Sequence, residues 1–93
     1  MFIETAATPN PATMKYLPGR PVLPAGTLDF RTTDAARRSP LAARLFAIGS
    51  VSRVFLGGDF ITVTKVDDIE WQHLNPVVLG VIMEHFVTGD PIV

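Results

Sequence analysis

Apolar and polar residues alternate most clearly in the middle of the chain, from Val51 to Val66. Two runs rich in β-branched and aromatic residues flank the pair Gly57-Gly58, a pattern typical of a β-hairpin. We expect a two-residue turn at these glycines, which would place Phe55 directly opposite Phe60. Because side chains alternate along a strand, one face of the hairpin is apolar and should pack against helices. That face carries Val54, Leu56, Ile61 and Val63.

The other face of this hairpin holds the residues that we take as candidates for contacting a partner. They are Arg53, Phe55, Phe60 and Thr62. The two phenylalanines have an ordinary interpretation as a cross-strand aromatic pair, which contributes at most about 1 kcal/mol to stability. They also have a functional interpretation, as part of a docking surface on an uncovered sheet face.

Three shorter stretches before the hairpin predict further strands, namely 1–6, 12–17 and 27–32. The segment Thr8-Pro9-Asn10-Pro11 separates the first two, since each proline removes a backbone donor and restricts the residue before it. The third stretch alternates apolar and polar side chains with a period of two, as expected of an edge strand.

Two cap-and-proline signals predict two helices. The first follows Ser39-Pro40, where serine is a favoured N-cap and proline suits the first helical position, and it should end at Gly49. A single helical turn is expected just before it, at 34–38. The second helix should start at Pro76, after Asn75, and run to about Val87. Its apolar face carries Leu74, Val78, Val81, Ile82 and His85.

This order of elements predicts one α+β domain spanning residues 1–93. We expect a two-layer sandwich, with a mainly antiparallel sheet of four or five short strands and two helices on one face.

Composition excludes several classes of protein. The net charge is −1 and the sequence pI is about 6.0, which argues against nucleic acid or an anionic membrane as partner. The chain has no cysteine, and therefore no disulfide, thiolate metal ligand or cysteine nucleophile. No apolar run approaches the roughly 20 residues of a membrane span. No export signal is visible at the N-terminus, so we expect a cytoplasmic, bacterial-type protein.

Residues that could carry chemistry are sparse, and we expect no enzyme. The serines lie outside any nucleophile-elbow motif. The weak candidates for metal ligation are His73, His85, Asp67, Asp68 and Glu70, which lack a recognised ligand spacing. Ordinary roles explain them better: His85 lies on the apolar helix face, and the acidic residues suit a solvated loop before a helix.

Several motifs, in order along the whole chain, resemble the N-terminal domain of the Nfu/NifU-like scaffold proteins. They are Phe2-Ile3-Glu4-Thr5, Thr8-Pro9-Asn10-Pro11, Lys15-Tyr16-Leu17-Pro18-Gly19, Ser39-Pro40-Leu41-Ala42, Leu45-Phe46, Ile48, Val54-Phe55, Asp59-Phe60-Ile61-Thr62-Val63-Thr64-Lys65, Trp71, Leu74, Pro76, Ile82-Met83 and Gly89.

This resemblance implies a part in iron–sulfur cluster biogenesis, as a scaffold or carrier that hands clusters to client apoproteins. In two-domain members of the family a C-x-x-C motif in a separate C-terminal domain holds the cluster. This chain has no cysteine, and thiolates are the usual cluster ligands, so we assign no cofactor to it alone. The implied partners are assembly proteins, client apoproteins and the cysteine-bearing domain, which lies outside this chain.

The expected function is therefore an accessory, non-catalytic interaction domain that docks through Arg53, Phe55, Phe60 and Thr62. A second candidate contact is the Thr8–Pro11 segment with Lys15, although its prolines favour a rigid turn over a recognition role. Two alternatives stay open. One is an iron donor using the histidines and carboxylates named above, and the other is a purely structural domain.

Overall fold

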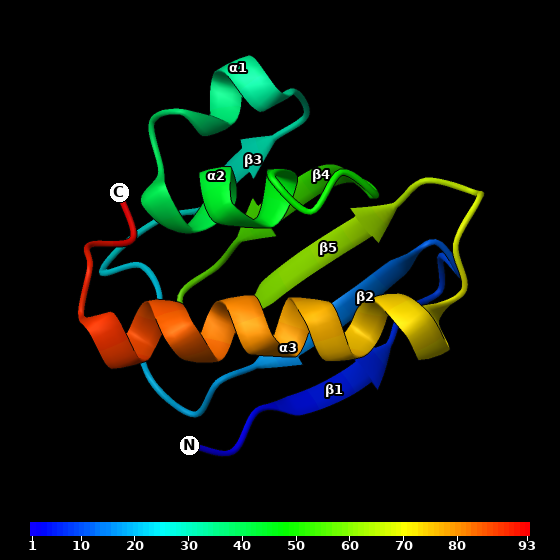
Figure 1. Ribbon diagram of the computed structural model, residues 1–93. Helices are drawn as coiled ribbons and strands as arrows, with labels where there is room; N and C mark the ends of the chain where they lie inside the picture. The colour runs from blue at the N-terminus through cyan, green and yellow to red at the C-terminus, as the bar shows by residue number, and fades with distance from the viewer.

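The computed structural model describes residues 1–93 and contains a five-stranded antiparallel sheet with helices on one face, so the predicted α+β class is confirmed (Figure 1). The strands lie in the order β1-β2-β5-β4-β3, which makes β1 and β3 the edges. The strands are β1 (Glu4–Ala7), β2 (Thr13–Leu17), β3 (Leu28–Phe30), β4 (Val51–Leu56) and β5 (Ile61–Lys65), and the helices are α1 (Thr33–Ala36), α2 (Pro40–Phe46) and α3 (Trp71–Thr88).

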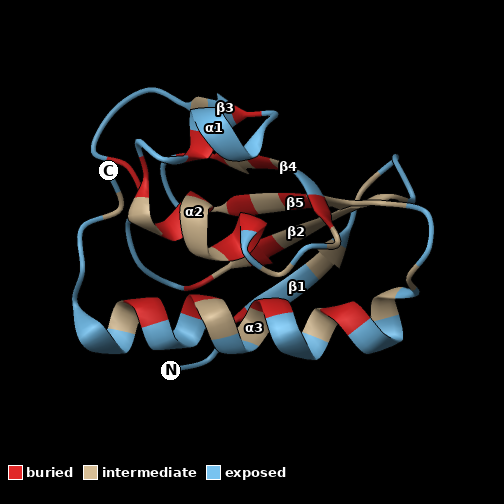
Figure 2. Ribbon diagram, turned by 45° about the horizontal axis from the view of Figure 1, so that its top comes forward, coloured by how far each residue is buried: buried red, intermediate tan, exposed pale blue.

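The core lies between the sheet and the helices α2 and α3. The four hairpin residues expected to face the helices are fully buried, which confirms that prediction. Buried segments of α2 and α3 are turned toward the sheet in Figure 2. The fully buried side chains that meet there are Tyr16, Val54, Leu56, Ile61, Val63, Leu41, Leu45, Leu74, Val78, Ile82 and His85. The opposite face of the sheet has no helix over it (Figure 1).

Helix α2 starts where the sequence predicts. The Ser39 hydroxyl accepts a hydrogen bond from the Ala42 amide at 3.1 Å, and Pro40 occupies the first turn. The regular helix ends at Phe46, because the Ile48 amide bonds to the Leu45 carbonyl in a tighter turn. The helical turn expected just before α2 is present as the short helix α1.

Helix α3 begins at Trp71, so the prediction that it starts at Pro76 is wrong. Tertiary contacts hold the additional turn in place. The Trp71 indole donates to the Pro11 carbonyl at 3.0 Å, and Leu74 is fully buried. Pro76 therefore lies inside the helix, where the carbonyl of the exposed Gln72 loses its usual helical donor. No helix is long and apolar enough to cross a membrane.

Asn75, expected to cap this helix, has a different role. Its side-chain oxygen accepts a hydrogen bond from the Tyr16 hydroxyl at 2.7 Å, which joins α3 to β2. The Tyr16 ring is buried, and this burial raises the pKa of its hydroxyl above the ordinary tyrosine value. The neutral hydroxyl is thereby kept as a donor to Asn75.

The predicted register of the central hairpin is also wrong. Leu56 pairs with Ile61 and Phe55 with Thr62, so residues 57–60 form a four-residue loop. Neither Gly57 nor Gly58 has the positive φ that the expected two-residue turn requires. From Arg53 onward the pairing differs from the prediction by two residues, and a shift of two leaves those side chains on their predicted faces. A bulge between Val51 and Arg53 turns Val51 into the core instead.

The C-terminal residues pack back onto α2. The Ser39 hydroxyl donates to the Ile92 carbonyl while it accepts from the amide at the start of α2. Arg44 in α2 makes a salt bridge with Asp90. Two contacts therefore hold the segment after α3 against the domain.

Candidate functional site

The uncovered face of the sheet carries an aromatic pair. Phe55 lies in β4 and Phe60 directly precedes β5. Their ring centroids are 6.0 Å apart and their planes differ by 21°, so the rings stack although the two residues are not paired in the ladder. Both side chains are half-buried. The two rings form a small apolar surface near the hairpin tip.

A lysine from a neighbouring strand lies over this aromatic pair. Lys15 in β2 is opposite Thr62 in β5, and its Nζ is 4.7 Å from the centroid of the Phe60 ring. An ammonium at this distance is attracted by the ring quadrupole, a cation–π contact worth about 0.5–1 kcal/mol at an exposed site. From the sequence, Lys15 is grouped only with the nearby Thr8–Pro11 segment. Its place beside Phe60 depends on the non-local pairing of β2 with β5.

Arg53 is held in place by a carboxylate from the edge strand. Its Nε and Nη2 donate to the two oxygens of Asp29 at 2.9 and 2.8 Å, a bidentate arrangement. Arg31 donates to the same carboxylate at 3.1 Å. The hydrogen bond from Arg53 lowers the pKa of Asp29 against the opposing effect of burial, so the carboxylate stays ionised. Asp29 and Arg31 were not found from the sequence.

We call these residues the open-face patch: Lys15, Asp29, Arg53, Phe55, Phe60 and Thr62. The patch holds two cations, Lys15 and Arg53, and one carboxylate, that of Asp29, so it is apolar at its centre and carries a net positive charge at its rim. Aromatic side chains and arginine are enriched in protein–protein interfaces, whereas nothing here activates a nucleophile or shares a proton. The arrangement suits contact with a protein surface that is apolar and acidic.

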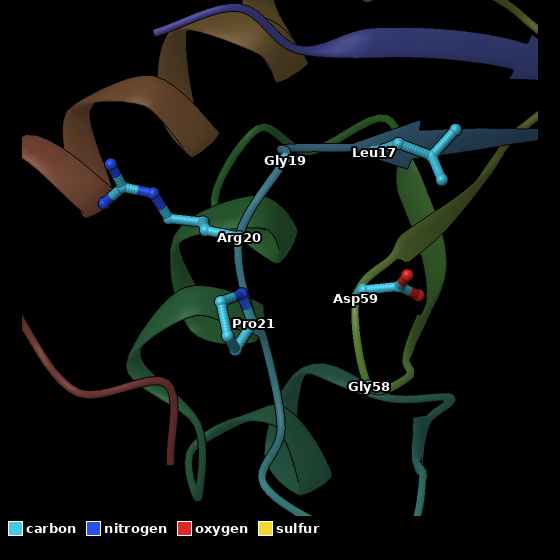
Figure 3. Close-up of a pocket in the computed structure, with 6 residues that line it drawn as sticks. All are labelled: Leu17, Gly19, Arg20, Pro21, Gly58 and Asp59. Atoms are coloured by element: carbon cyan, nitrogen blue, oxygen red, sulfur yellow. The ribbon is translucent and has the colours of Figure 1, made fainter.

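A shallow hollow of about 370 Å³ lies beside the hairpin tip (Figure 3). The Gly58 carbonyl at its edge accepts the amides of Val22 and Leu23 at 2.7 and 3.3 Å. The Arg20 side chain points out of the hollow toward α3, where its guanidinium lies 5.1 Å from the Phe86 ring. The lining residues are Leu17, Gly19, Arg20, Pro21, Gly58 and Asp59. The hollow borders the open-face patch through Asp59, the neighbour of Phe60.

Hydrogen bonds within the chain already occupy polar groups of the Thr8–Pro11 segment. The Thr8 hydroxyl accepts from the Asn10 amide at 3.2 Å, and the Asn10 side-chain oxygen accepts from the Ala12 amide at 3.0 Å. The Pro11 carbonyl accepts from Trp71. These bonds build a rigid turn that supports the start of α3, which is the structural role considered from the sequence.

The residues considered for metal ligation do not come together in one metal site. His73 is exposed on the outer side of α3, whereas His85 is fully buried on the inner side. Asp67, Asp68 and Glu70 lie in the connector before α3. No group of three or more histidine, aspartate or glutamate side chains is placed to hold a metal ion.

His85 takes part in packing. Its Nδ1 lies 3.0 Å from an Arg44 nitrogen, and because arginine only donates, Nδ1 accepts. The buried Nε2 has no hydrogen-bond partner within the chain. Burial and the neighbouring Arg44 charge lower the pKa of His85, although Asp90 opposes this shift. The ring is thus held neutral beside Phe86, with centroids 6.0 Å apart in a T-shaped contact.

Residues 3–89 match the family described as scaffold protein Nfu/NifU N terminal. This chain belongs to that family. The resemblance stated from the sequence motifs is therefore confirmed.

Curated relatives match this Nfu N-terminal domain along its whole length. The human NFU1 iron-sulfur cluster scaffold homolog, mitochondrial, is 51% identical over 94 residues, covering 100% of this chain and 37% of the human protein. NifU-like protein 5, mitochondrial, from Arabidopsis thaliana is 47% identical, covering 99% of this chain and 34% of that protein. The domain thus spans about a third of the length of these relatives.

Solved structures share the fold. A NifU-like protein from Saccharomyces cerevisiae superimposes with a TM-score of 0.84 at 22% identity, covering 99% of this chain and 83% of that chain. Protein SAV1430 from Staphylococcus aureus gives a TM-score of 0.75 at 25% identity, covering 88% of this chain and 99% of that chain.

The relatives correct one prediction from the sequence. A cytoplasmic, bacterial-type protein was expected, whereas the human and Arabidopsis relatives at 44–51% identity are named as mitochondrial proteins. The cytoplasmic prediction is therefore wrong. It depended on the N-terminal residues alone, which carry no information about a longer protein.

Proposed function

We propose that this domain is a non-catalytic docking module of an iron–sulfur cluster scaffold or carrier. Membership of the Nfu N-terminal family and the similarity to proteins named as iron–sulfur cluster scaffolds support this assignment. The observation that carries it is the open-face patch, in which Phe55 and Phe60 stack on the one sheet face that no helix covers. The domain binds protein partners there during cluster assembly or delivery.

The chemistry of the patch defines the kind of partner. Phe55 and Phe60 supply the apolar centre, Thr62 offers a hydroxyl, and Lys15 and Arg53 supply positive charge at the rim. A complementary surface presents an apolar side chain surrounded by carboxylates. The candidates are assembly proteins, client apoproteins and the cysteine-bearing domain of the same scaffold.

The cluster itself is the cargo of the scaffold, and residues outside this chain hold it. Iron–sulfur clusters are bound mainly through cysteine thiolates, and this chain contains none. The residues of this domain therefore do not fit a cluster site. This domain contributes to delivery by binding the partner, which brings the acceptor close to the protein surface that carries the cluster.

A domain exchange tests this function directly. The matching segment of the human relative is replaced by this chain, and the rate of cluster delivery to a cluster-free [4Fe–4S] acceptor is measured. Substituting both Phe55→Ser and Phe60→Ser should slow delivery about tenfold or more at subsaturating acceptor, since central aromatic residues each contribute more than about 1 kcal/mol to binding.

The control is Phe2→Ser, which changes an exposed phenylalanine just before β1, the edge strand separated from β5 by β2. This variant should deliver clusters at the unchanged rate. All proteins are assayed well below their unfolding temperatures, so that a loss of stability is not read as a loss of docking. Unchanged delivery by the folded double variant would refute the proposal.

A further inference from the structure

The outer side of α3 is unusually apolar for a helix that faces solvent. Val77, Met83 and Val87 are 47%, 40% and 77% exposed, and the exposed Gly80 lies among them. A surface helix normally presents polar residues on the side away from the core. Among the exposed polar side chains of α3, His73 and Glu84 lie on the same stripe as Val77 and Val87. The alternation of buried and exposed segments along α3 is visible in Figure 2.

These outer residues have the spacing of a helix–helix seam. Steps of four and three residues bring successive side chains onto one stripe of a helix, which is the pattern by which two helices pack along each other. The stripe on α3 consists of His73, Val77, Gly80, Glu84 and Val87. It lies on the side of α3 away from the sheet and is separate from the open-face patch.

We propose that α3 pairs with the α3 of a second copy of this chain, antiparallel and about a twofold axis that passes between Val77 and Gly80. In this register the Val77 side chain of each copy lies over Gly80 of the other. His73 of each copy lies beside Glu84 of the other. The symmetry makes every contact twice.

The shapes of the two central residues support a second copy as the occupant. Gly80 leaves a notch in the helix surface, since no atom lies within 4 Å of the position where its Cβ would be. Val77, one helical turn earlier, is a 47% exposed branched side chain of a size to fill such a notch. One antiparallel register fills both notches at once.

The charges support the same register. A parallel pairing would bring Glu84 against Glu84 and leave Gly80 facing Gly80, which adds repulsion and a void. The antiparallel register brings a carboxylate to an imidazole instead, which is the complementary arrangement. The net charge of the chain is only −1, so two copies repel each other little.

The contact is limited to one helix face, and it belongs to the small interfaces that bury less than about 1,200 Å² in total. The dimer is therefore reversible and forms at high protein concentration. Sedimentation equilibrium of the 93-residue chain, from about 10 µM to about 1 mM, should show a concentration-dependent monomer–dimer equilibrium. A monomer at every concentration would refute the proposal.

Gly80→Leu tests the notch. Leucine fills it and should weaken the dimer at least tenfold. The variant should unfold at a higher temperature than wild type, because Leu is a better helix former than Gly and the site is open. Loss of the dimer then cannot come from misfolding. A dimer as stable as wild type in Gly80→Leu would refute the proposal.

An exchange of charges tests the register. His73→Glu should weaken the dimer, because two carboxylates then face each other. Combining His73→Glu with Glu84→His should restore it, whereas a merely structural role of these exposed residues predicts no recovery. The double variant Phe55→Ser with Phe60→Ser, on the other side of the sheet, should dimerise like wild type. A failure to recover, or an effect of the phenylalanine changes, would contradict the α3 interface.

Discussion

The ring of Phe60 lies directly over the backbone of Gly57. A Cβ at Gly57 would come within 2.2 Å of the Phe60 Cε1 atom, a distance that no side chain tolerates. The Gly57 amide also donates to the Phe60 carbonyl at 2.9 Å, which closes the four-residue loop. Glycine is needed here for space rather than for a positive φ. This close approach positions Phe60 to stack with Phe55 in the open-face patch.

Gly57→Ala should therefore destabilise the domain by about 1–3 kcal/mol, the usual range for overpacking, and displace the Phe60 ring. The matched control is Gly58→Ala, because nothing lies within 4 Å of its Cβ position and its φ is ordinary. That change should stay within about 0.5 kcal/mol of wild type. Urea unfolding measures both free energies. Equal effects of the two substitutions would show that the Phe60 ring does not occupy this place.

Ser39 links the start of α2 to the C-terminal segment, since its one hydroxyl both caps the helix and donates to the Ile92 carbonyl. Ser39→Ala should lower the free energy of unfolding by about 1–3 kcal/mol, as the lost cap and the lost buried hydrogen bond combine. Thr32→Ala, which removes only the exposed cap of α1, is the control and should cost less. If urea unfolding shows that the two substitutions lower the free energy of unfolding equally, the hydrogen bond to Ile92 does not contribute to stability.

His85 should make the domain less stable in mild acid. Burial first, and Arg44 second, lower the pKa of His85 in the folded state below its unfolded value of about 6.5. The unfolded chain then binds the proton more readily, so the free energy of unfolding falls as the pH decreases below about 6.5, by at most about 1.4 kcal/mol per pH unit. This pH dependence fades above the unfolded pKa and is nearly gone at about pH 8.

Thermal or urea unfolding between about pH 5 and pH 8 measures this effect, which follows from the histidine charge change in that range. The control is His85→Asn, which keeps an acceptor for Arg44 but does not titrate. Whatever its absolute stability, this variant should show a flatter pH profile than wild type. A profile as steep as that of wild type would assign the acid sensitivity to another group.

Ferrous iron should not bind to this domain in a saturable, stoichiometric way. His73 and His85 lie on opposite sides of α3, and the Arg44 guanidinium is bonded to His85 Nδ1. Anaerobic calorimetry with amide NMR shifts recorded alongside is the measurement. Binding with shifts centred on these histidines or on the acidic connector, and lost in His→Ala variants, would instead support the iron-donor alternative.

Most of the architecture could be predicted from local patterns. Alternation along Val51–Val66 identified the buried hairpin face, and Ser39-Pro40 identified the start of α2. The errors come from single contacts rather than from periodicity. Trp71 binds the Pro11 carbonyl across the molecule at the start of α3, and the Phe60 ring packs over Gly57 within the four-residue loop. Neither contact leaves a periodic signal in the sequence.

The candidate site was only partly predictable for the same reason. Arg53 and Phe55 lie on one strand, and alternation places them on one face. Lys15 and Asp29 join them only because β2 pairs with β5 and β3 pairs with β4. Such non-local pairings follow from the whole topology. The places of Lys15 and Asp29 in the patch therefore became visible only in the structure.

The most direct test of the docking account is an amide chemical-shift map. This domain is isotope-labelled within the exchanged human relative, and the cluster-free acceptor of the delivery assay is added. We predict shifts confined to the uncovered sheet face, at Arg53, Phe55, Phe60, Thr62 and Lys15, which disappear in the double phenylalanine variant. Shifts confined to the helical side, or no shifts in this domain while delivery proceeds, would contradict the account.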